Sequence, residues 1–459
     1  MKKKKVKSFR QEVTVREALK NGNVATRMSC LLMGFGNFAQ KQIIKGLLFM
    51  MAEVAFLCFF FIGGITNIEH LITLGTKTTG KVFDETKQIY VYTQGDNSML
   101  FLLYGITTLF IIGIFIYIWR ASLKSAYYAQ TVAESGRTPN TFKQDLVSLL
   151  DANVHKTLLF MPIVCIIAFT ILPIVFMMCM AFTNYDRDHQ PPGQLFKWVG
   201  MVNFQKVLDT SNGLGYAFWH VLGWTFIWAV FATFLNYILG MILAMIINRK
   251  DTKLKKFWRS IFILSIAVPQ FVSLLVVRTM LQPEGAINTL LKSWGLIHKS
   301  LPFWTSITWA RVTVIIVNLW VGIPFTMMQT TGILQNIPAE LYEAAKVDGA
   351  NAVVTFFKIT LPYMLFVTTP YLITTFVGNI NNFNVIYLLT KGAPASLSYY
   401  NGTAGKTDLL ITWLYKLTID FKDYNYGAVI GILVFIISAV LALSTYRHTG
   451  SYNKEEEFQ

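Results

Sequence analysis

The chain has 459 residues, of which 54% are hydrophobic and only 14% are charged, too few charges to cover a water-soluble protein of this size. The net charge of +16 does not indicate a nucleic-acid-binding protein, because the basic residues stand between long apolar blocks and no nucleic-acid-binding motif accompanies them. Several of these blocks reach the roughly 20 residues that a helix needs to cross the hydrocarbon core of a bilayer. The sequence therefore predicts an all-α polytopic membrane protein.

Eight long apolar blocks follow one another along the chain, and each predicts a transmembrane helix. The expected spans cover residues 46–66, 99–119, 157–183, 218–247, 257–280, 309–333, 361–384 and 426–447. Glu53 lies inside the first span, where a carboxylate is costly unless it faces protein or reaches the lipid headgroups. Prolines inside these blocks allow kinks where neighbouring groups satisfy the freed carbonyls; they are Pro162, Pro173, Pro269, Pro324 and Pro370.

The distribution of lysine and arginine predicts an N-in, C-in topology. The N-terminal segment and residues 248–256 are strongly basic, whereas the segments expected outside the membrane mix acids and bases. We therefore divide the chain into a cytoplasmic basic N-terminal arm, two accessory spans with an extracellular loop, a six-span core and a cytoplasmic tail. These parts cover residues 1–45, 46–156, 157–447 and 448–459. We expect the arm to enforce the topology, with contact to anionic membrane lipid as the alternative.

Two of the outside loops carry local signals, and none of the motifs in the chain supports catalysis. Residues 82–93 show short alternating runs typical of strands, and residues 392–407 have the composition of an irregular loop. The segment 75–81 imitates a phosphate-binding loop, but Val82 stands where a magnesium-binding Ser or Thr is required. The histidines and the four cysteines show no metal-ligand or disulfide spacing. We expect no catalytic residue and no metal site.

The segment between the sixth and seventh spans, within the loop 334–360, predicts a helix–turn–helix elbow on the cytoplasmic face. Pro338 suits a first helical turn, and the residues that follow it favour a helix. Gly349 can adopt a positive φ and turn the chain, and Asn351 can cap a second short helix that ends near Ile359. Leu341, Ala344 and Ala345 are expected to form a smooth apolar surface. By local physics alone, an ordinary amphipathic connector explains the segment equally well.

This segment resembles the EAA loop of ABC-importer permeases, whose pattern is Glu-Ala-Ala, three residues, Gly, nine residues, Ile, one residue and Leu-Pro. Every fixed position is matched, by Glu343, Ala344, Ala345, Gly349, Ile359, Leu361 and Pro362. In that family the loop holds a helix that docks into a cleft on a cytoplasmic ATPase subunit. The resemblance implies that the coupling residues here are Glu343, Ala344, Ala345, Asp348, Gly349, Leu361 and Pro362.

The resemblance covers residues 157–447 and looks closest to the larger membrane subunit of maltose/maltodextrin importers. It implies a type I permease core that works by alternating access, with no cofactor in this chain and with ATP and magnesium in the partner ATPase. The implied partners are a second permease subunit in a heterodimer, two ATPase copies, an extracellular sugar-binding lipoprotein and an oligosaccharide. The short loop after the third span resembles versions from bacteria with a single membrane, which implies their plasma membrane as the location.

Unusual polar groups stand at lipid depth in the fifth, sixth and seventh spans, and they have two interpretations. Amides buried in hydrocarbon are costly unless paired, so they can serve as hydrogen-bonded contacts between helices. Amides beside aromatic rings can equally bind the hydroxyls and C–H faces of a sugar. Together with the resemblance, we favour a sugar site formed by Gln270, Val321, Gly322, Phe325, Thr375, Gly378, Asn379 and Asn382.

Three alternatives stay open at this point. The first is an ABC permease for another oligosaccharide or a polyol, because several site residues differ from those of the enteric maltose proteins. The second is a secondary sugar transporter driven by an ion gradient, although Glu53 is the only clear acid within a predicted span. The third is a membrane scaffold or sensor that reuses the permease fold without transporting.

Overall fold

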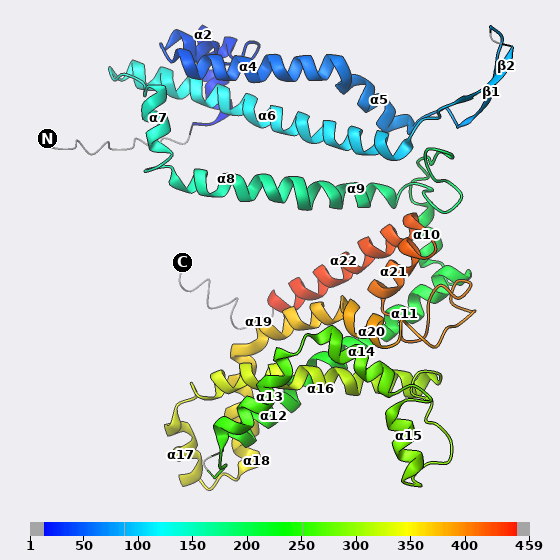
Figure 1. The fold of residues 1–459 in the computed structure, drawn as a ribbon. Coiled ribbons are helices and arrows are strands. Elements are labelled where there is room, and N and C mark those ends of the chain that lie inside the picture. The colour runs from blue at the N-terminus through cyan, green and yellow to red at the C-terminus, as the bar shows by residue number, and fades with distance from the viewer. Residues whose placement is uncertain (1–12, 87, 250, 448–459) are drawn as a thin grey trace. The chain divides into compact units, whose positions relative to one another are not determined.

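A computed structural model describes residues 13–86, 88–249 and 251–447, and Figure 1 shows its helical fold. Most of the predicted basic arm is included, but residues 1–12 and the predicted tail 448–459 lie outside the described part. The helices pack as two compact units. The first contains the described residues up to Met180 together with Asp188–Trp198, and the second contains Ala181–Arg187 and the described residues from Val199 onward. The functional boundary at residue 157 stays a prediction.

The first unit consists of three short helices, three long apolar helical segments, a connecting helix and one β-hairpin. In chain order these are α1 (Val15–Asn21), α2 (Val24–Met28), α3 (Phe35–Ala39), α4 (Ile43–Phe59), the π-helical η1 (Phe60–Gly64), α5 (Ile65–Thr73), β1 (Gly80–Asp84), β2 (Ile89–Thr93), α6 (Ser98–Glu134), α7 (Phe142–Ser148), α8 (Val154–Ile166), η2 (Ile167–Ile171) and α9 (Leu172–Met180). The hairpin confirms the strand signal predicted for residues 82–93, with Phe83 opposite Tyr90 in the antiparallel register.

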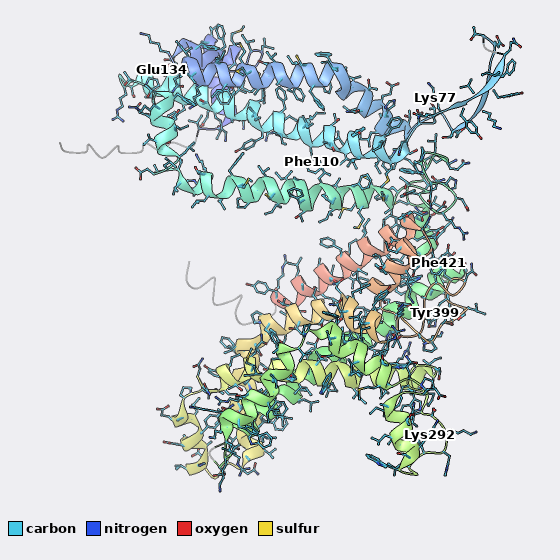
Figure 2. All side chains as sticks on the ribbon, in the orientation of Figure 1. Lys77, Phe110, Glu134, Lys292, Tyr399 and Phe421 are labelled. Carbon is cyan, nitrogen blue, oxygen red and sulfur yellow. The ribbon has the colours of Figure 1, made fainter. Side chains whose placement is uncertain are left out.

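The N-terminal helices α1–α3 pack against the C-terminal end of α6. This helix has 37 residues and ends at Glu134 (Figure 2); at 1.5 Å per residue it is about 55 Å long, against a hydrocarbon core of about 30 Å. Its extra turns hold α1–α3: the Gly34 N–H donates to Ser122 Oγ (3.0 Å) and the Asn23 N–H to Gln130 Oε1 (2.9 Å). The Glu53 carboxylate accepts the Met33 N–H at 2.7 Å, so this acid faces protein.

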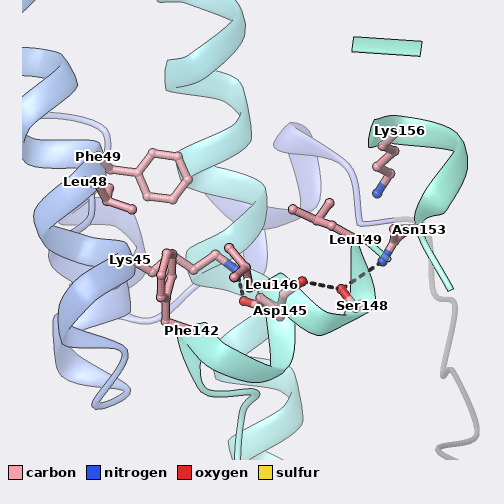
Figure 3. A pocket seen from close by; sticks show the side chains of 10 residues that line it. All are labelled: Lys45, Leu48, Phe49, Phe142, Asp145, Leu146, Ser148, Leu149, Asn153 and Lys156. Carbon is pink, nitrogen blue, oxygen red and sulfur yellow. Dashed lines mark hydrogen bonds and ion pairs between the residues drawn. The ribbon is translucent and has the colours of Figure 1, made fainter. Parts of the chain in front are cut away.

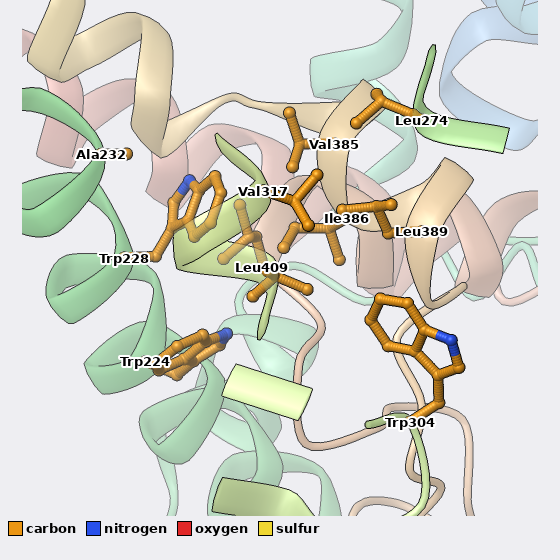
Figure 4. Packing of buried hydrophobic residues seen from close by; sticks show 11 residues of the cluster. Trp224, Trp228, Ala232, Leu274, Trp304, Val317, Val385, Ile386, Leu389 and Leu409 are labelled. Carbon is orange, nitrogen blue, oxygen red and sulfur yellow. The ribbon is translucent and has the colours of Figure 1, made fainter. Parts of the chain in front are cut away.

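The second unit contains the remaining helices. They are α10 (Val202–Leu208), α11 (Gly213–Val230), η3 (Phe231–Leu235), α12 (Asn236–Asn248), α13 (Lys255–Ala267), α14 (Gln270–Met280), α15 (Ala286–Ser293), α16 (Ile307–Leu334), α17 (Ala339–Val347), α18 (Ala352–Thr355), η4 (Phe356–Thr360), α19 (Leu361–Ile380), α20 (Phe383–Leu389), α21 (Leu410–Ile419) and α22 (Tyr424–Arg447). Its principal core joins α11, α14, α16 and α20, with Trp224, Trp228 and Leu274 among its buried members (Figure 4).

The predicted count of eight spans is confirmed when one bent helix pair is taken as a single span. Seven helical segments of the described residues are long and apolar enough to cross a membrane, and the pair α13–α14 is the eighth. The span predicted for 257–280 is bent at one of the prolines expected to allow a kink, since α13 and α14 meet at 87° around Val268 and Pro269. Proline lacks the N–H that continues a helix and forces the residue before it towards an extended conformation.

The seventh span also differs from its predicted bounds of 361–384. It ends at Ile380, because Asn382 breaks the helix and caps the separate helix α20, with its Oδ1 accepting the Val385 N–H at 3.2 Å. At its other end, helix continues without a turn through η4 into α18. Residues Leu361 and Pro362 therefore lie within one long helical segment instead of opening it.

The loop between α20 and α21, residues 390–409, is irregular as predicted, but it is tightly packed. The loop contains one isolated antiparallel β-bridge, between Ala395 and Gly405, and no other isolated bridge occurs among the described residues. The carboxylate of Asp408 is fully buried beneath the loop and accepts from Lys416 Nζ (2.6 Å) and the Gly405 N–H (2.7 Å). Tyr399, labelled in Figure 2, lies under the Lys406 ammonium, which is 3.5 Å from the ring centroid.

Candidate functional site

The predicted elbow is present, and its turn is held by a complete set of backbone hydrogen bonds. Helix α17 ends at Val347, and Gly349 follows with φ of +73°. The Gly349 N–H donates to the Lys346 carbonyl (3.1 Å) and the Ala350 N–H to the Ala345 carbonyl (2.8 Å). This is the Schellman ending of a helix, in which the residue at the left-handed position is usually glycine. The sequence prediction of a turn at Gly349 is confirmed.

The second arm of the elbow starts where the sequence predicts it. The Asn351 side chain accepts the Val354 N–H at 2.9 Å and caps α18. Tyr342 on α17 shares a hydrogen bond of 3.1 Å with Thr360 at the base of the seventh span. Because Tyr342 also packs on the core around Tyr237 and Met364, α17 contacts the fourth and the seventh spans.

The surface that the elbow presents differs in one detail from the prediction. Ala345 is buried, whereas Leu341 and Ala344 are exposed, although all three line one groove. Val347 is exposed instead, at 88% of its surface, and Glu343, Asp348 and Gly349 are exposed as well. Between α17 and α18 lies a groove of about 600 Å³ with Leu341, Asp348 and Lys358 in its walls. The elbow thus offers an exposed helix and an adjoining groove to another molecule.

The predicted sugar residues lie on four helices around the principal core, with different exposures. Asn379, Asn382, Thr375, Val321 and Gly322 are half-buried, and Val321 packs against the core. Phe325, Gly378 and Gln270 are exposed, and Gln270 stands at the start of α14, directly after the bend. The structure brings the two amides together, and within its described residues no hydrogen bond joins either of them to Gln270.

Asn379 and Asn382 belong to a hydrogen-bonded network between helices. The Asn379 amide donates to Thr233 Oγ1 (2.9 Å), and its own Oδ1 accepts from the Asn382 amide (3.4 Å). Trp228 Nε1 donates to the Asn379 backbone carbonyl (3.2 Å). The contact between spans that we considered from the sequence is therefore real for Asn379, whereas the hydrogen bonds of the Asn382 side chain join residues three positions away. They also fix the direction in which each amide points, which is what a binding site requires of its polar groups.

The fourth span also contributes a polar residue, Asn236, which was not among the predicted site residues. Asn236 is buried, and its amide nitrogen donates to the Ala232 carbonyl at 2.8 Å. Within the described part of the chain its Oδ1 has no hydrogen-bond partner. It packs so closely on α16 that a Cβ on Gly322 would lie 2.7 Å from it. An Asn in an apolar block is the same signal that identified Asn379, and it was available for the fourth span too.

A set of apolar spans, an exposed elbow between two of them and oriented amides at membrane depth define a membrane-embedded transport permease. Residues 236–450 match the family model described as "Binding-protein-dependent transport system inner membrane component". The chain belongs to this family of ABC-importer permeases, and as such it is a transport subunit and not an enzyme.

Similar proteins support this assignment over most of the chain. The galactooligosaccharides transport system permease protein GanP of Bacillus subtilis (strain 168) is 33% identical over 429 residues, which cover 93% of this chain and 97% of that protein. The maltodextrin transport system permease protein MalC of Streptococcus pneumoniae is 33% identical over 438 residues, covering 93% and 96%. A solved bacterial ABC transporter for alginate import has the same fold, with a TM-score of 0.51 and 21% identity over 66% of this chain and 96% of that one.

Proposed function

We propose that the chain is a membrane-spanning subunit of an ATP-driven importer of maltodextrin. In this proposal the elbow α17–α18 binds a separate ATPase subunit and moves when that subunit changes conformation. The observation that carries this proposal is the elbow itself, an exposed helix that Tyr342 joins to membrane spans, with its turn at Gly349. Such a contact transmits a displacement of α17 to the seventh span. We place both termini and the elbow in the cytoplasm, following the positive-inside rule.

The proposed assembly contains a second permease subunit, two ATPase copies that bind ATP and magnesium, and an extracellular sugar-binding lipoprotein in the plasma membrane of a single-membrane bacterium. The names of the relatives support an oligosaccharide as the cargo, with maltodextrin for one and galactooligosaccharides for another. A galactooligosaccharide is therefore the second candidate substrate.

Purification of the complete complex tests this function directly. The chain should be expressed with its partner subunits and reconstituted in vesicles. These vesicles should transport maltodextrins only when ATP is supplied on the side of the membrane where the ATPase subunits lie. Sugar-stimulated ATP hydrolysis, compared between a maltose-to-maltoheptaose series and a galactooligosaccharide series, identifies the cargo. Accumulation of sugar without ATP under an ion gradient would contradict the proposal and favour the secondary transporter.

The two amides of the network should contribute to sugar binding. We expect Asn379→Ala to weaken sugar affinity about fivefold, the effect of one lost hydrogen bond of about 1 kcal/mol. Asn382 needs a gentler change because it caps α20, so Asn382→Ser keeps a capping oxygen and removes only the amide. The measurement is the sugar concentration for half-maximal uptake in vesicles.

The exposed neighbour Asn381 supplies the matched control, because within the described residues its amide donates to the Val377 carbonyl of its own helix and to no other group. Asn381→Ala should leave uptake unchanged. If Asn379→Ala and Asn382→Ser also transport normally while the complex assembles, the two amides serve only as contacts between helices.

A further inference from the structure

A pocket of about 390 Å³ lies in the first unit where the spans α4 and α8 begin and where α7 connects α6 to α8 (Figure 3). One part of its wall is apolar, with Phe49 from α4 and Leu149 just after α7. The other part carries the ammonium groups of Lys45 and Lys156. The pocket shares no residue with the elbow or with the amide network, so transport as proposed above leaves it unexplained.

The charge of the pocket is unbalanced towards the positive. Lys45 Nζ pairs with Asp145 Oδ2 at 2.8 Å, and each side chain keeps 29% of its surface exposed. Lys156 is exposed, and in the part of the chain that the structure describes its ammonium makes no hydrogen bond or ion pair. Figure 3 shows Lys156 above Asn153, whose own amide donates to Ser148 Oγ at 3.2 Å. One cation is thus available for an anion, and a second one is held beside it by Asp145.

The pocket stands at the level where a bilayer changes from headgroups to hydrocarbon. Lys45 and Lys156 lie in the first turns of two candidate spans, Ile43–Thr73 and Val154–Met180. Only 6% of the apolar window of each span is buried inside the chain, so both helices leave apolar sides uncovered by the rest of this chain. Lysines at the ends of apolar helices extend towards the phosphates of the headgroups.

We propose that this pocket binds an anionic phospholipid, with its phosphate between Lys156 and Lys45 and the start of an acyl chain against Phe49 and Leu149. Basic pockets between membrane helices recognise headgroups in this way. The apolar wall distinguishes the lipid from a soluble phosphate, which gains nothing from contact with Phe49 and Leu149. Asp145 lowers the affinity of the pocket for the lipid phosphate, because its carboxylate pairs with Lys45 while the lipid is absent.

Lipid binding to the purified full-length chain tests the assignment. Native mass spectrometry of the protein in neutral detergent measures the affinity for phosphatidylglycerol, with phosphatidylcholine as the uncharged comparison. Lys156→Gln should weaken phosphatidylglycerol binding about fivefold, the contribution of one lysine near a charged membrane surface. Lys156→Arg should retain it. Asp145→Asn should tighten it, because Lys45 is then free for the phosphate.

Lys143 provides the matched control, since it is an exposed lysine on α7 that does not line the pocket. Lys143→Gln should bind phosphatidylglycerol as the unchanged protein does. Equal losses in Lys143→Gln and Lys156→Gln would overturn the site in favour of general charge attraction. Failure of Asp145→Asn to tighten binding, or competition by glycerol 3-phosphate at the same concentration as phosphatidylglycerol, would overturn it as well.

Discussion

Replacement of Gly349 by proline should abolish uptake while the protein still inserts into the membrane. Gly349 has φ of +73°, and proline is restricted to about −65°. The change also removes the N–H that donates to the Lys346 carbonyl. In addition, a proline at 349 disfavours the nearly helical backbone conformation that Asp348 has in the unchanged protein. Each of these effects redirects α18 relative to α17. Uptake of labelled maltodextrin should fall at least tenfold at an unchanged amount of protein in the membrane.

Two variants separate the turn from a general loss of folding. Gly349→Asn should keep most of the activity, because asparagine adopts the left-handed conformation more readily than other residues and space is open around the Cβ position. Gly136 has a similar φ of +74°, and its N–H donates to the Ala133 carbonyl after α6, outside the elbow. Gly136→Pro should therefore transport. Normal uptake by Gly349→Pro would remove the elbow from the mechanism.

Replacement of Lys416 by methionine should lower the stability of the second unit by about 3 kcal/mol, because breaking a buried ion pair leaves an uncompensated charge. Lys416 is the cation for Asp408, whose side chain is fully buried. The remaining donors to this carboxylate are the Gly405 N–H and the Thr412 hydroxyl (2.9 Å). The measurement is the thermal unfolding of the purified protein, with a lower melting temperature as the expected result.

The same variant should acquire a distinct dependence on pH. Burial raises the pKa of Asp408, and Lys416 opposes that rise. An acid with a raised pKa in the folded state stabilises the fold at low pH and loses that contribution as the pH rises through the folded pKa. Without Lys416 only the hydrogen bonds from Gly405 and Thr412 oppose the rise of this pKa, so Lys416→Met should be more stable at pH 5 than at pH 8.

Removal of both charges completes this test. Asp408→Asn combined with Lys416→Met should recover part of the lost stability and remove its pH dependence. Lys391→Met, at an exposed lysine of the same loop, should change neither quantity. A melting temperature of Lys416→Met equal to that of Lys391→Met would show that the pair does not hold the loop.

The elbow shows how far local sequence carries a prediction. A Schellman turn and a capped helix depend on residues within five positions of each other. Gly349 therefore predicted the turn correctly from the local sequence, and Asn351 predicted the cap of α18. Whether a helical residue faces outward depends on what packs against it. The burial of Ala345 and the exposure of Val347 therefore follow from where the elbow lies on the spans, which the local pattern does not contain.

The spans divide in the same way. Apolar length and the spacing of basic residues are properties of the sequence by itself, and they determined the membrane class, the count of spans and the helix-breaking potential of Pro269. The 87° bend and the pairing of Asn379 with Thr233 needed the tertiary structure. These features join residues more than a hundred positions apart, or depend on which of several prolines bends its helix, and only packing between helices decides such matters. The buried carboxylate of Asp408, eight residues from its lysine, was also visible only once the loop had closed over it.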